Sequence, residues 1–258
     1  MMPNSGAGAE TTSTTMAWWM LAMIAYPETQ FRAHAELDAV VGRGRVPTFS
    51  DYPHLPYIRA MVKEVLRWRP ATPLAAPHRS IEDDWYGEVF IPKGTICIPN
   101  VWHMNHDPAI YGNSAANFDP ARYLDEAGGD IMSSPSDAKE EGHVTYGFGR
   151  RVCVGRYMAN NSLFIQIAML LWATNIKRKT DPSGLHLPLD VDGFVDHGII
   201  MSVGSPYTSK SVADFCGDSV EVRRLLNARS LRASRKLPVS LHMNVSCGVC
   251  EHRRRIHK

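Results

Sequence analysis

The loop at residues 146–155, which reads YGFGRRVCVG, constrains the fold more than any other stretch of this chain. Its glycines, Gly149 and Gly155 among them, permit positive φ angles and let the backbone approach a flat partner closely. Cys153 stands at the expected start of an apolar helix over 158–172, where free N–H groups and the helix dipole favour a thiolate. Such a loop is suited to pressing a cysteine against a flat surface.

Two arginines stand just before the cysteine, and they suggest what the flat partner carries. Arg150 and Arg151 are suited to gripping carboxylates through paired hydrogen bonds. A thiolate, a flat apolar surface and carboxylates together describe a haem held by cysteine. A glycine-rich turn around a buried structural cysteine is the alternative interpretation.

Composition bounds the class of protein. The 258 residues are 44% hydrophobic and 21% charged, which is enough for one sizeable core or two small ones. A net charge of +2 predicts no polyanionic partner, so we expect no nucleic acid. The five cysteines form no regular framework, which favours a reducing compartment. No signal peptide is evident, and the apolar run at 16–26 is shorter than the ~20 residues that span a bilayer.

Proline positions predict three helices. We expect the first over 5–25, ending before Pro27, and the second over 28–41. Pro56 suits the first turn of a third helix, which Pro70 terminates. The expected buried side of the second helix is Phe31, Leu37, Val40 and Val41. The expected buried face of the third helix is Ile58, Met61, Val62, Val65 and Leu66.

The pattern then changes from helical to extended. Two β-branched runs, at 89–91 and 95–98, are joined by proline, lysine and glycine, which predicts a hairpin. Cys97 lies in the second run, and we interpret it as a small core residue.

Several short motifs resemble those of the cytochrome P450 family, and they occur in the family's order. The loop at 146–155 resembles the haem-ligand signature F-x-x-G-x-R-x-C-x-G, with Tyr146 in place of the leading phenylalanine. Residues 7–12, AGAETT, resemble the oxygen-binding kink of the long helix over the haem. Glu64 and Arg67 resemble the family's E-x-x-R motif. Residues 118–123, FDPARY, resemble its F-x-P-x-R-F pattern.

The resemblance implies a mainly α fold with small β-sheets, a partial cytochrome P450 fold that lacks the N-terminal helices and looks fungal. It implies haem b as the cofactor, with the Cys153 thiolate as axial ligand of the iron. Tyr146, Gly149 and Gly155 would shape the loop at the haem, while Arg151 and Arg79 would pair with haem propionates. As an alternative, Arg79 is an ordinary surface arginine.

The other motif residues divide between chemistry and structure. By resemblance, Glu10 and Thr11 relay protons towards dioxygen over the haem, whereas the alternative is a simple helix cap. By the same resemblance Glu64, Arg67 and Arg122 form a buried structural network; the alternative for Glu64 and Arg67 is a solvated surface pair.

We divide the chain into a P450-like part over 1–200 and an atypical basic tail over 201–258. We expect the tail to be disordered, or to come from a shifted reading frame or a retained intron. A C-x-x-C pair at 247–250, with His242, is a weak zinc hypothesis.

The resemblance implies a haem-thiolate monooxygenase that oxidises a small apolar substrate with electrons from NADPH-cytochrome P450 reductase. The basic surface around Arg150 and Arg156 is expected to receive that acidic partner. Location at the endoplasmic reticulum membrane is implied by the family alone. The alternative is a truncated P450-derived fragment with little or no haem binding or turnover, because half a pocket would leave the haem open to water.

Overall fold

The computed structural model describes residues 5–125, 141–196, 200–203 and 220–223. These residues are mainly helical with small antiparallel sheets, as the sequence predicts. The α-helices are α1 (Ser5–Ala25), α2 (Pro27–Val40), α3 (Pro56–Trp68), α4 (Val101–Asn105), α5 (Pro108–Tyr111) and α6 (Arg156–Ala173). The 3-10 helices are η1 (Phe49–His54), η2 (Pro120–Tyr123) and η3 (Gly149–Arg151). The strands are β1 (His78–Arg79), β2 (Asp84–Tyr86), β3 (Val89–Ile91), β4 (Ile96–Cys97), β5 (Thr174–Ile176), β6 (Phe194–Asp196), β7 (Met201–Val203) and β8 (Val220–Val222).

Prolines set the ends of the main helices. Pro27 opens α2, so α1 stops at Ala25, because the residue before a proline disfavours helical backbone. Pro56 occupies the first turn of α3, and Trp68 ends that helix before Pro70. The three predicted helices therefore form close to their expected bounds.

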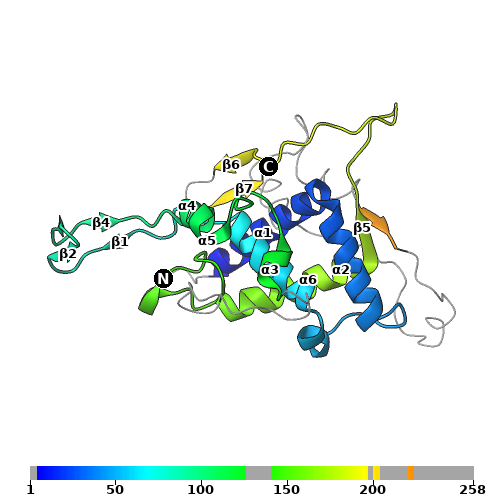
Figure 1. Cartoon of the computed structure of the whole chain (residues 1–258), viewed down its shortest axis with the longest axis horizontal. Coiled ribbons are helices and arrows are strands. Elements are labelled where there is room, and N and C mark those ends of the chain that lie inside the picture. The colour runs from blue at the N-terminus through cyan, green and yellow to red at the C-terminus, as the bar shows by residue number, and fades with distance from the viewer. Residues whose placement is uncertain (1–4, 126–140, 197–199, 204–219, 224–258) are drawn as a thin grey trace, which may run out of the picture.

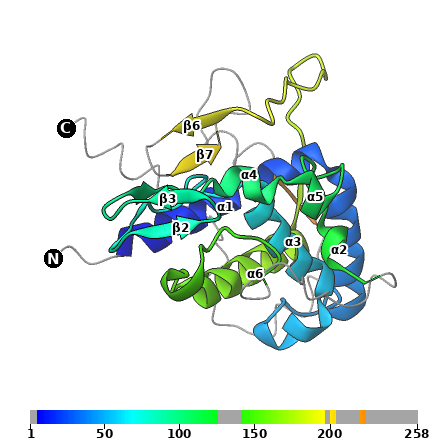
Figure 2. The same ribbon diagram turned by 60° about the vertical axis from the view of Figure 1, so that its left-hand side comes forward.

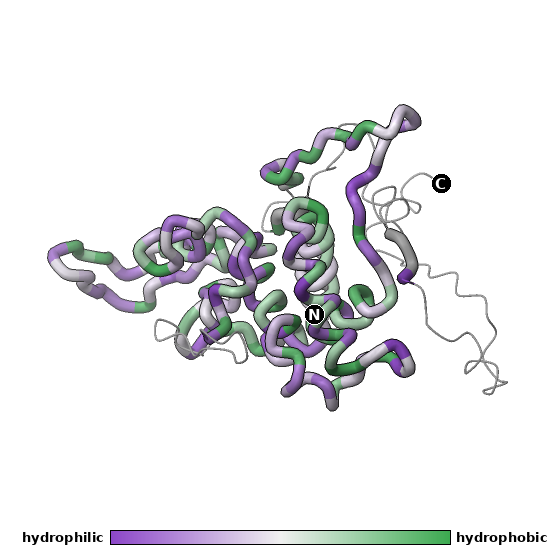
Figure 3. The backbone as a smooth tube through the Cα atoms, turned by 45° about the vertical axis from the view of Figure 1, so that its right-hand side comes forward, coloured by the Kyte–Doolittle hydropathy of each residue, from purple (hydrophilic) through white to green (hydrophobic). Residues whose placement is uncertain are grey.

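Helix α1 lies at the centre of the core. Its consecutive residues Trp18 and Trp19 are both buried, and so are Leu21, Ala22 and Met23. A helix that is apolar on every side must be covered on every side. Helices α2, α3 and α6 pack around it (Figure 1). Figure 3 shows the hydrophobic segments, in green, gathered in this helical body.

The predicted buried face of α3 packs into this core, and its residues Ile58, Met61 and Val65 are fully buried. The predicted face of α2 is only half right. Leu37 and Val41 are buried, but Phe31 is 67% exposed and Val40 is 37% exposed.

Phe31 and Val40 are exposed because polar side chains of α2 form hydrogen bonds with β5. Gln30 is buried because its side chain exchanges two hydrogen bonds with the backbone of Ile176 on β5. His34 is buried against the carbonyl oxygen of Thr174, 3.2 Å away. These contacts turn the Gln30 and His34 side of α2 inward, so Phe31 faces outward.

The predicted hairpin between 89–91 and 95–98 is wrong. Strand β3 pairs with β2 across a turn at Gly87, whose φ is 58°. Strand β4 pairs with β1 instead, so the four strands form one long ribbon with β2 and β3 at its tip. The ribbon extends away from the helical body (Figure 1). Cys97 is consequently exposed, and its interpretation as a core residue is wrong.

Two further pairs of strands each join a strand of the P450-like part to a strand beyond residue 200. Strand β6 pairs with β7, and β7 packs against α1 (Figure 2). Strand β5 pairs with β8. Both β7 and β8 lie beyond residue 200, in the segment that the sequence sets apart as a tail. The cysteines of the zinc hypothesis and His242 lie outside the described residues.

Within the described residues, no helix combines the length and the apolar character that a membrane crossing requires.

Candidate functional site

The loop that carries Cys153 folds back on itself just before α6. The Cys153 amide donates a hydrogen bond to the carbonyl oxygen of Tyr146 at 2.8 Å, which closes the loop at its base. Gly147 and Gly149 have φ angles of 78° and 55°, which L side chains rarely adopt. Gly155 is the N-cap of α6. Gly147 and Gly149 are therefore required by the backbone path, whereas the φ of Gly155 is −84°, which any residue can adopt.

The thiol of Cys153 is exposed and unpaired. A Cβ added at Gly155 would lie 3.9 Å from the Cys153 Sγ, at ordinary van der Waals distance, so Gly155 lies directly beside the sulfur. The N-terminal end of the 18-residue helix α6 directly follows.

Several apolar side chains close to Cys153 in the sequence are exposed. Phe148 is 41% exposed, Met158 is 77% exposed and Val154 is 96% exposed. Arg151 is exposed on the same loop, and Arg79 is exposed on β1. The Arg79 guanidinium passes over Gly94, where an added Cβ would lie 3.3 Å from its Nη2. An exposed thiol, exposed apolar groups and exposed guanidinium groups are the groups that a haem needs for its iron, its apolar ring and its propionates, although no hydrogen bond or ion pair joins Arg79 to the cysteine loop within the described residues.

Behind the loop, α3 carries a fully buried ion pair. Arg67 donates through Nε to Glu64 Oε2 and through Nη2 to Glu64 Oε1, both at 2.8 Å. Neither side chain has exposed surface. Burial acts to lower the pKa of Arg67, but the hydrogen bonds and charge of Glu64 outweigh it and raise that pKa. The surface-pair interpretation is therefore wrong for Glu64 and Arg67.

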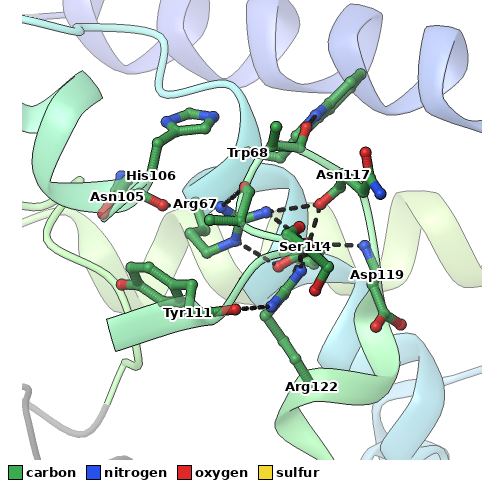
Figure 4. Close-up of polar contacts among 12 residues, drawn as sticks. Arg67, Trp68, Asn105, His106, Tyr111, Ser114, Asn117, Asp119 and Arg122 are labelled. Atoms are coloured by element: carbon green, nitrogen blue, oxygen red, sulfur yellow. Dashed lines mark hydrogen bonds and ion pairs between the residues drawn. The ribbon is translucent and has the colours of Figure 1, made fainter. Parts of the chain in front are cut away.

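A second guanidinium joins the same carboxylate. Arg122 Nε donates to Glu64 Oε1 at 3.1 Å, and the Asp119 amide donates to that oxygen at 2.7 Å. Arg67 also donates to the carbonyl oxygens of Asn105, Ala115 and Asn117 at 2.7–2.9 Å. Figure 4 shows Arg67 and Arg122 converging on this backbone segment. The three motif residues thus lock the segment before η2 onto α3.

Two residues that sequence reasoning missed connect this cluster to the cysteine loop. The Asn105 side chain donates through Nδ2 to Thr145 Oγ1 at 2.9 Å, and its Oδ1 accepts from the Val144 backbone amide at 3.0 Å. Thr145 Oγ1 donates to the Leu66 carbonyl oxygen on α3 at 2.6 Å. Because the Asn105 carbonyl binds Arg67, α3 positions both ends of this connection. Neither residue type carries a sequence signal that would have distinguished it from a surface amide or hydroxyl.

Glu10 and Thr11 lie in the first half of α1, away from the cysteine loop in sequence but on a helix that packs against α6. Glu10 is exposed and Thr11 is half-buried. Hydroxyl groups around them bond back to the helix: Thr12 to the Gly8 carbonyl at 2.8 Å, and Thr15 to the Thr11 carbonyl at 2.9 Å. Glu10 is inside α1 and is not a cap, since the helix begins at Ser5.

Comparison with known proteins identifies the class that this fold and site define. The cytochrome P450 family model matches residues 1–183, and the chain belongs to that family.

The relatives are fungal. A cytochrome P450 monooxygenase of Armillaria gallica is 66% identical over 194 residues, covering 75% of this chain and 37% of the relative. Cytochrome P450 monooxygenase 253 of Postia placenta is 54% identical over 195 residues, covering 76% of this chain and 36% of the relative. The chain therefore spans a little over a third of the length of these relatives.

A solved structure shows the same fold. A zebrafish cytochrome P450, in a structure with abiraterone, matches with a TM-score of 0.67 and 32% identity. The match covers 85% of this chain and 46% of the zebrafish chain. The partial P450 fold expected from the sequence is thereby confirmed.

Proposed function

We propose that this chain carries the haem-thiolate centre of a cytochrome P450 monooxygenase that oxidises a small apolar substrate. The observation that carries the proposal is the free, exposed Cys153 thiol on a loop anchored to α3 and α6. Haem b, when bound, supplies the iron that activates dioxygen with electrons from a reductase. The residues of this chain would bind and orient the haem and deliver protons to the reaction.

Cys153 would hold the iron through its thiolate, next to the N-terminal end of α6. The positive φ of Gly149 lets the loop turn, Gly155 lies directly beside the sulfur, and the Tyr146 carbonyl accepts the Cys153 amide hydrogen. Arg151 and Arg79 would bind the propionates through paired hydrogen bonds, which fixes the rotation of the ring in its plane.

Glu10 and Thr11 would supply protons on the side of α1. The Glu10 carboxyl is exposed and can exchange protons with water, while the half-buried Thr11 hydroxyl can both accept and donate one. A pair of this kind passes protons inward stepwise without admitting bulk water.

The electron donor would be NADPH-cytochrome P450 reductase, and exposed Arg150 is suited to an acidic partner surface. Arg156 is less suited than the sequence suggested. It lies 3.9 Å from Glu141 and donates to the Tyr157 hydroxyl at 2.6 Å, so its charge is already engaged. The endoplasmic reticulum membrane is the location that this partner implies.

A second candidate is a P450-derived polypeptide that holds haem poorly or not at all. The observation that favours it is the exposure of large apolar groups, including Val154 at 96%, Tyr86 at 80% and Met158 at 77%. Exposed apolar groups of this size lower solubility and leave a bound ring open to water.

Haem titration of the purified 258-residue chain separates the two candidates. Saturation at one haem per chain, followed by reduction with NADPH and the reductase, supports the haem-thiolate centre. No saturable haem band, together with strong binding of a hydrophobic dye, supports the second candidate and contradicts the first.

A further inference from the structure

Tyr146 brings a hydroxyl group to a position where the family pattern has phenylalanine, and the structure uses that hydroxyl. It donates to the side-chain oxygen Oδ1 of Asn160 on α6 at 2.7 Å. The Tyr146 ring itself packs at the edge of the apolar core and lies 5.4 Å from the His143 ring. Phenylalanine would keep this packing and lose the hydrogen bond, so the two contributions can be separated.

The direction of this hydrogen bond is fixed by the next group along. Asn160 donates through Nδ2 to Glu141 Oε2 at 3.0 Å. A carboxylate only accepts hydrogen bonds, so the amide nitrogen of Asn160 must face Glu141 and its oxygen must face Tyr146. The Tyr146 hydroxyl is therefore the donor, and no rotation of the groups reverses the chain.

Glu141 in turn joins the start of this loop to two helices. Its carboxylate faces Asn160 and Arg156, which lie four residues apart on one side of α6. Its backbone carbonyl accepts a hydrogen bond from the Lys63 ammonium of α3 at 2.8 Å. The segment that leads to Tyr146 is thus held to α6 by side chains and to α3 by its backbone.

Tyr146 also contacts the cysteine directly. Its carbonyl oxygen accepts the Cys153 amide hydrogen at 2.8 Å, at the base of the loop. A side chain fixed to α6 restricts the rotation of its own peptide group, and so restricts the direction of that carbonyl.

We propose that Glu141, Asn160 and Tyr146 form a hydrogen-bonded chain that positions Cys153, with Tyr146 as the positioning residue. The hydroxyl of Tyr146 fixes the carbonyl that holds the cysteine amide, and α6 is the reference to which both are tied. The consequence for a bound haem rests on the proposed function, but the positioning itself concerns the polypeptide alone.

Tyr146→Phe tests the proposal in the full chain without haem. NMR-detected hydrogen exchange at the Cys153 amide is expected to accelerate about fivefold, as for the loss of one buried hydrogen bond. The Ala159 amide, which donates to the Gly155 carbonyl inside α6, is the internal reference and should not change. Tyr86→Phe is the matched control, because it removes a hydroxyl from a side chain that is 80% exposed.

Asn160→Leu provides a second route to the same result. It should accelerate exchange at Cys153 to a similar extent, and adding Tyr146→Phe to it should produce little further change, because both break one chain of contacts. Glu141→Gln keeps an acceptor for the Asn160 amide and should retain most of the protection. Unchanged exchange at Cys153 in Tyr146→Phe, or equal acceleration at Cys153 and Ala159, would overturn the proposal.

A haem-loaded sample adds a readout specific to the sulfur. Tyr146→Phe is expected to raise the fraction of reduced, CO-bound haem that has lost thiolate ligation at mildly acid pH, about fivefold relative to Tyr86→Phe. Absence of haem binding in every variant would contradict the proposed function, while the exchange result would still decide the positioning role. Equal fractions in the two variants would overturn the role of Tyr146 at the haem.

Discussion

The guanidinium group of Arg67 holds both carboxylate oxygens of Glu64 at 2.8 Å, and neither side chain has any exposed surface. Two buried charges are costly to desolvate, and only complete pairing offsets that cost. The arrangement is complete, because Arg122 and the Asp119 amide take up the remaining capacity of Glu64 Oε1. Removing one member therefore leaves another buried charge without its partner.

Arg67→Met should lower the free energy of unfolding by about 3–5 kcal/mol, since it leaves the buried Glu64 carboxylate short of a partner. It also removes the Arg67 hydrogen bonds to the backbone carbonyls of Asn105, Ala115 and Asn117, of which the last keeps a bond from Arg122 at 3.4 Å. Urea unfolding followed by tryptophan fluorescence measures the loss. Arg150→Met, at an exposed arginine, is the control and should change stability by no more than about 0.5 kcal/mol. A similar small effect at Arg67 would contradict this account.

A second buried arginine should depend on its planar shape. The Arg69 guanidinium carbon lies 4.3 Å from the centroid of the Trp68 ring and 5.0 Å from that of Trp102. It also donates to Asp192 Oδ1 at 2.8 Å and to the Val191 carbonyl at 3.2 Å. Burial lowers the pKa of Arg69, although Asp192 opposes that shift.

Arg69→Lys should therefore cost about 1–3 kcal/mol of stability, because an ammonium group lacks the planar face that stacks on the rings. Asp192→Asn is the comparison, since the Asp192 side chain is 92% exposed and its charge is screened by water. We expect less than about 1 kcal/mol there. Urea unfolding of both variants measures the difference, and equal losses would show that the rings contribute nothing.

The sequence predicts the elements of this fold better than their contacts. Pro27, Pro56 and Pro70 act through local backbone geometry, so the helix bounds follow from them directly. The pairing of β3 with β2 follows from a positive φ at Gly87, which a single sequence does not distinguish from the turn at Gly94. Exposure of Cys97 depends on where the ribbon extends, and that is a property of the whole fold.

The candidate site shows the same division. Cys153, Glu64 and Arg67 stand in motifs whose spacing suggests their contacts. Asn105 and Asn160 each act through two side-chain hydrogen bonds, which include bonds to residues 40 and 14 positions away, and no periodic pattern marks such contacts. Tyr146 is visible as a departure from the family pattern, but only the structure gives its hydroxyl a partner.

Stability should fall in mild acid because of buried neutral histidines. Burial, aided by the charges of Lys63 and Arg67, lowers the pKa of His143 to about 3. Burial, followed by the charge of Arg223, lowers the pKa of His34 to about 4. An unfolded histidine titrates near pH ~6.5, so below that pH the unfolded chain binds protons that the folded chain excludes.

The contribution of His143 is therefore complete above pH ~6.5 and declines as the pH falls towards 3, by up to about 1.4 kcal/mol per pH unit. His143→Gln should remove about 2 kcal/mol of the decline in unfolding free energy between pH 6.5 and 5. Urea titrations at the two pH values measure this slope. His34→Gln should also reduce the pH dependence of the unfolding free energy. If His143→Gln left the pH dependence of the unfolding free energy unchanged, protonation of this histidine would not contribute to unfolding in acid.

The spectrum of the reduced, CO-bound chain tests the haem-thiolate centre most directly. Cys153→Ser and Cys97→Ser make the same change at two exposed, free cysteines, of which Cys153 alone lies on the loop before α6. We predict that the unchanged chain and Cys97→Ser show the red-shifted Soret band of thiolate ligation, and that Cys153→Ser loses it. Retention of that band in Cys153→Ser would contradict the assignment of the iron ligand, and with it the proposed centre.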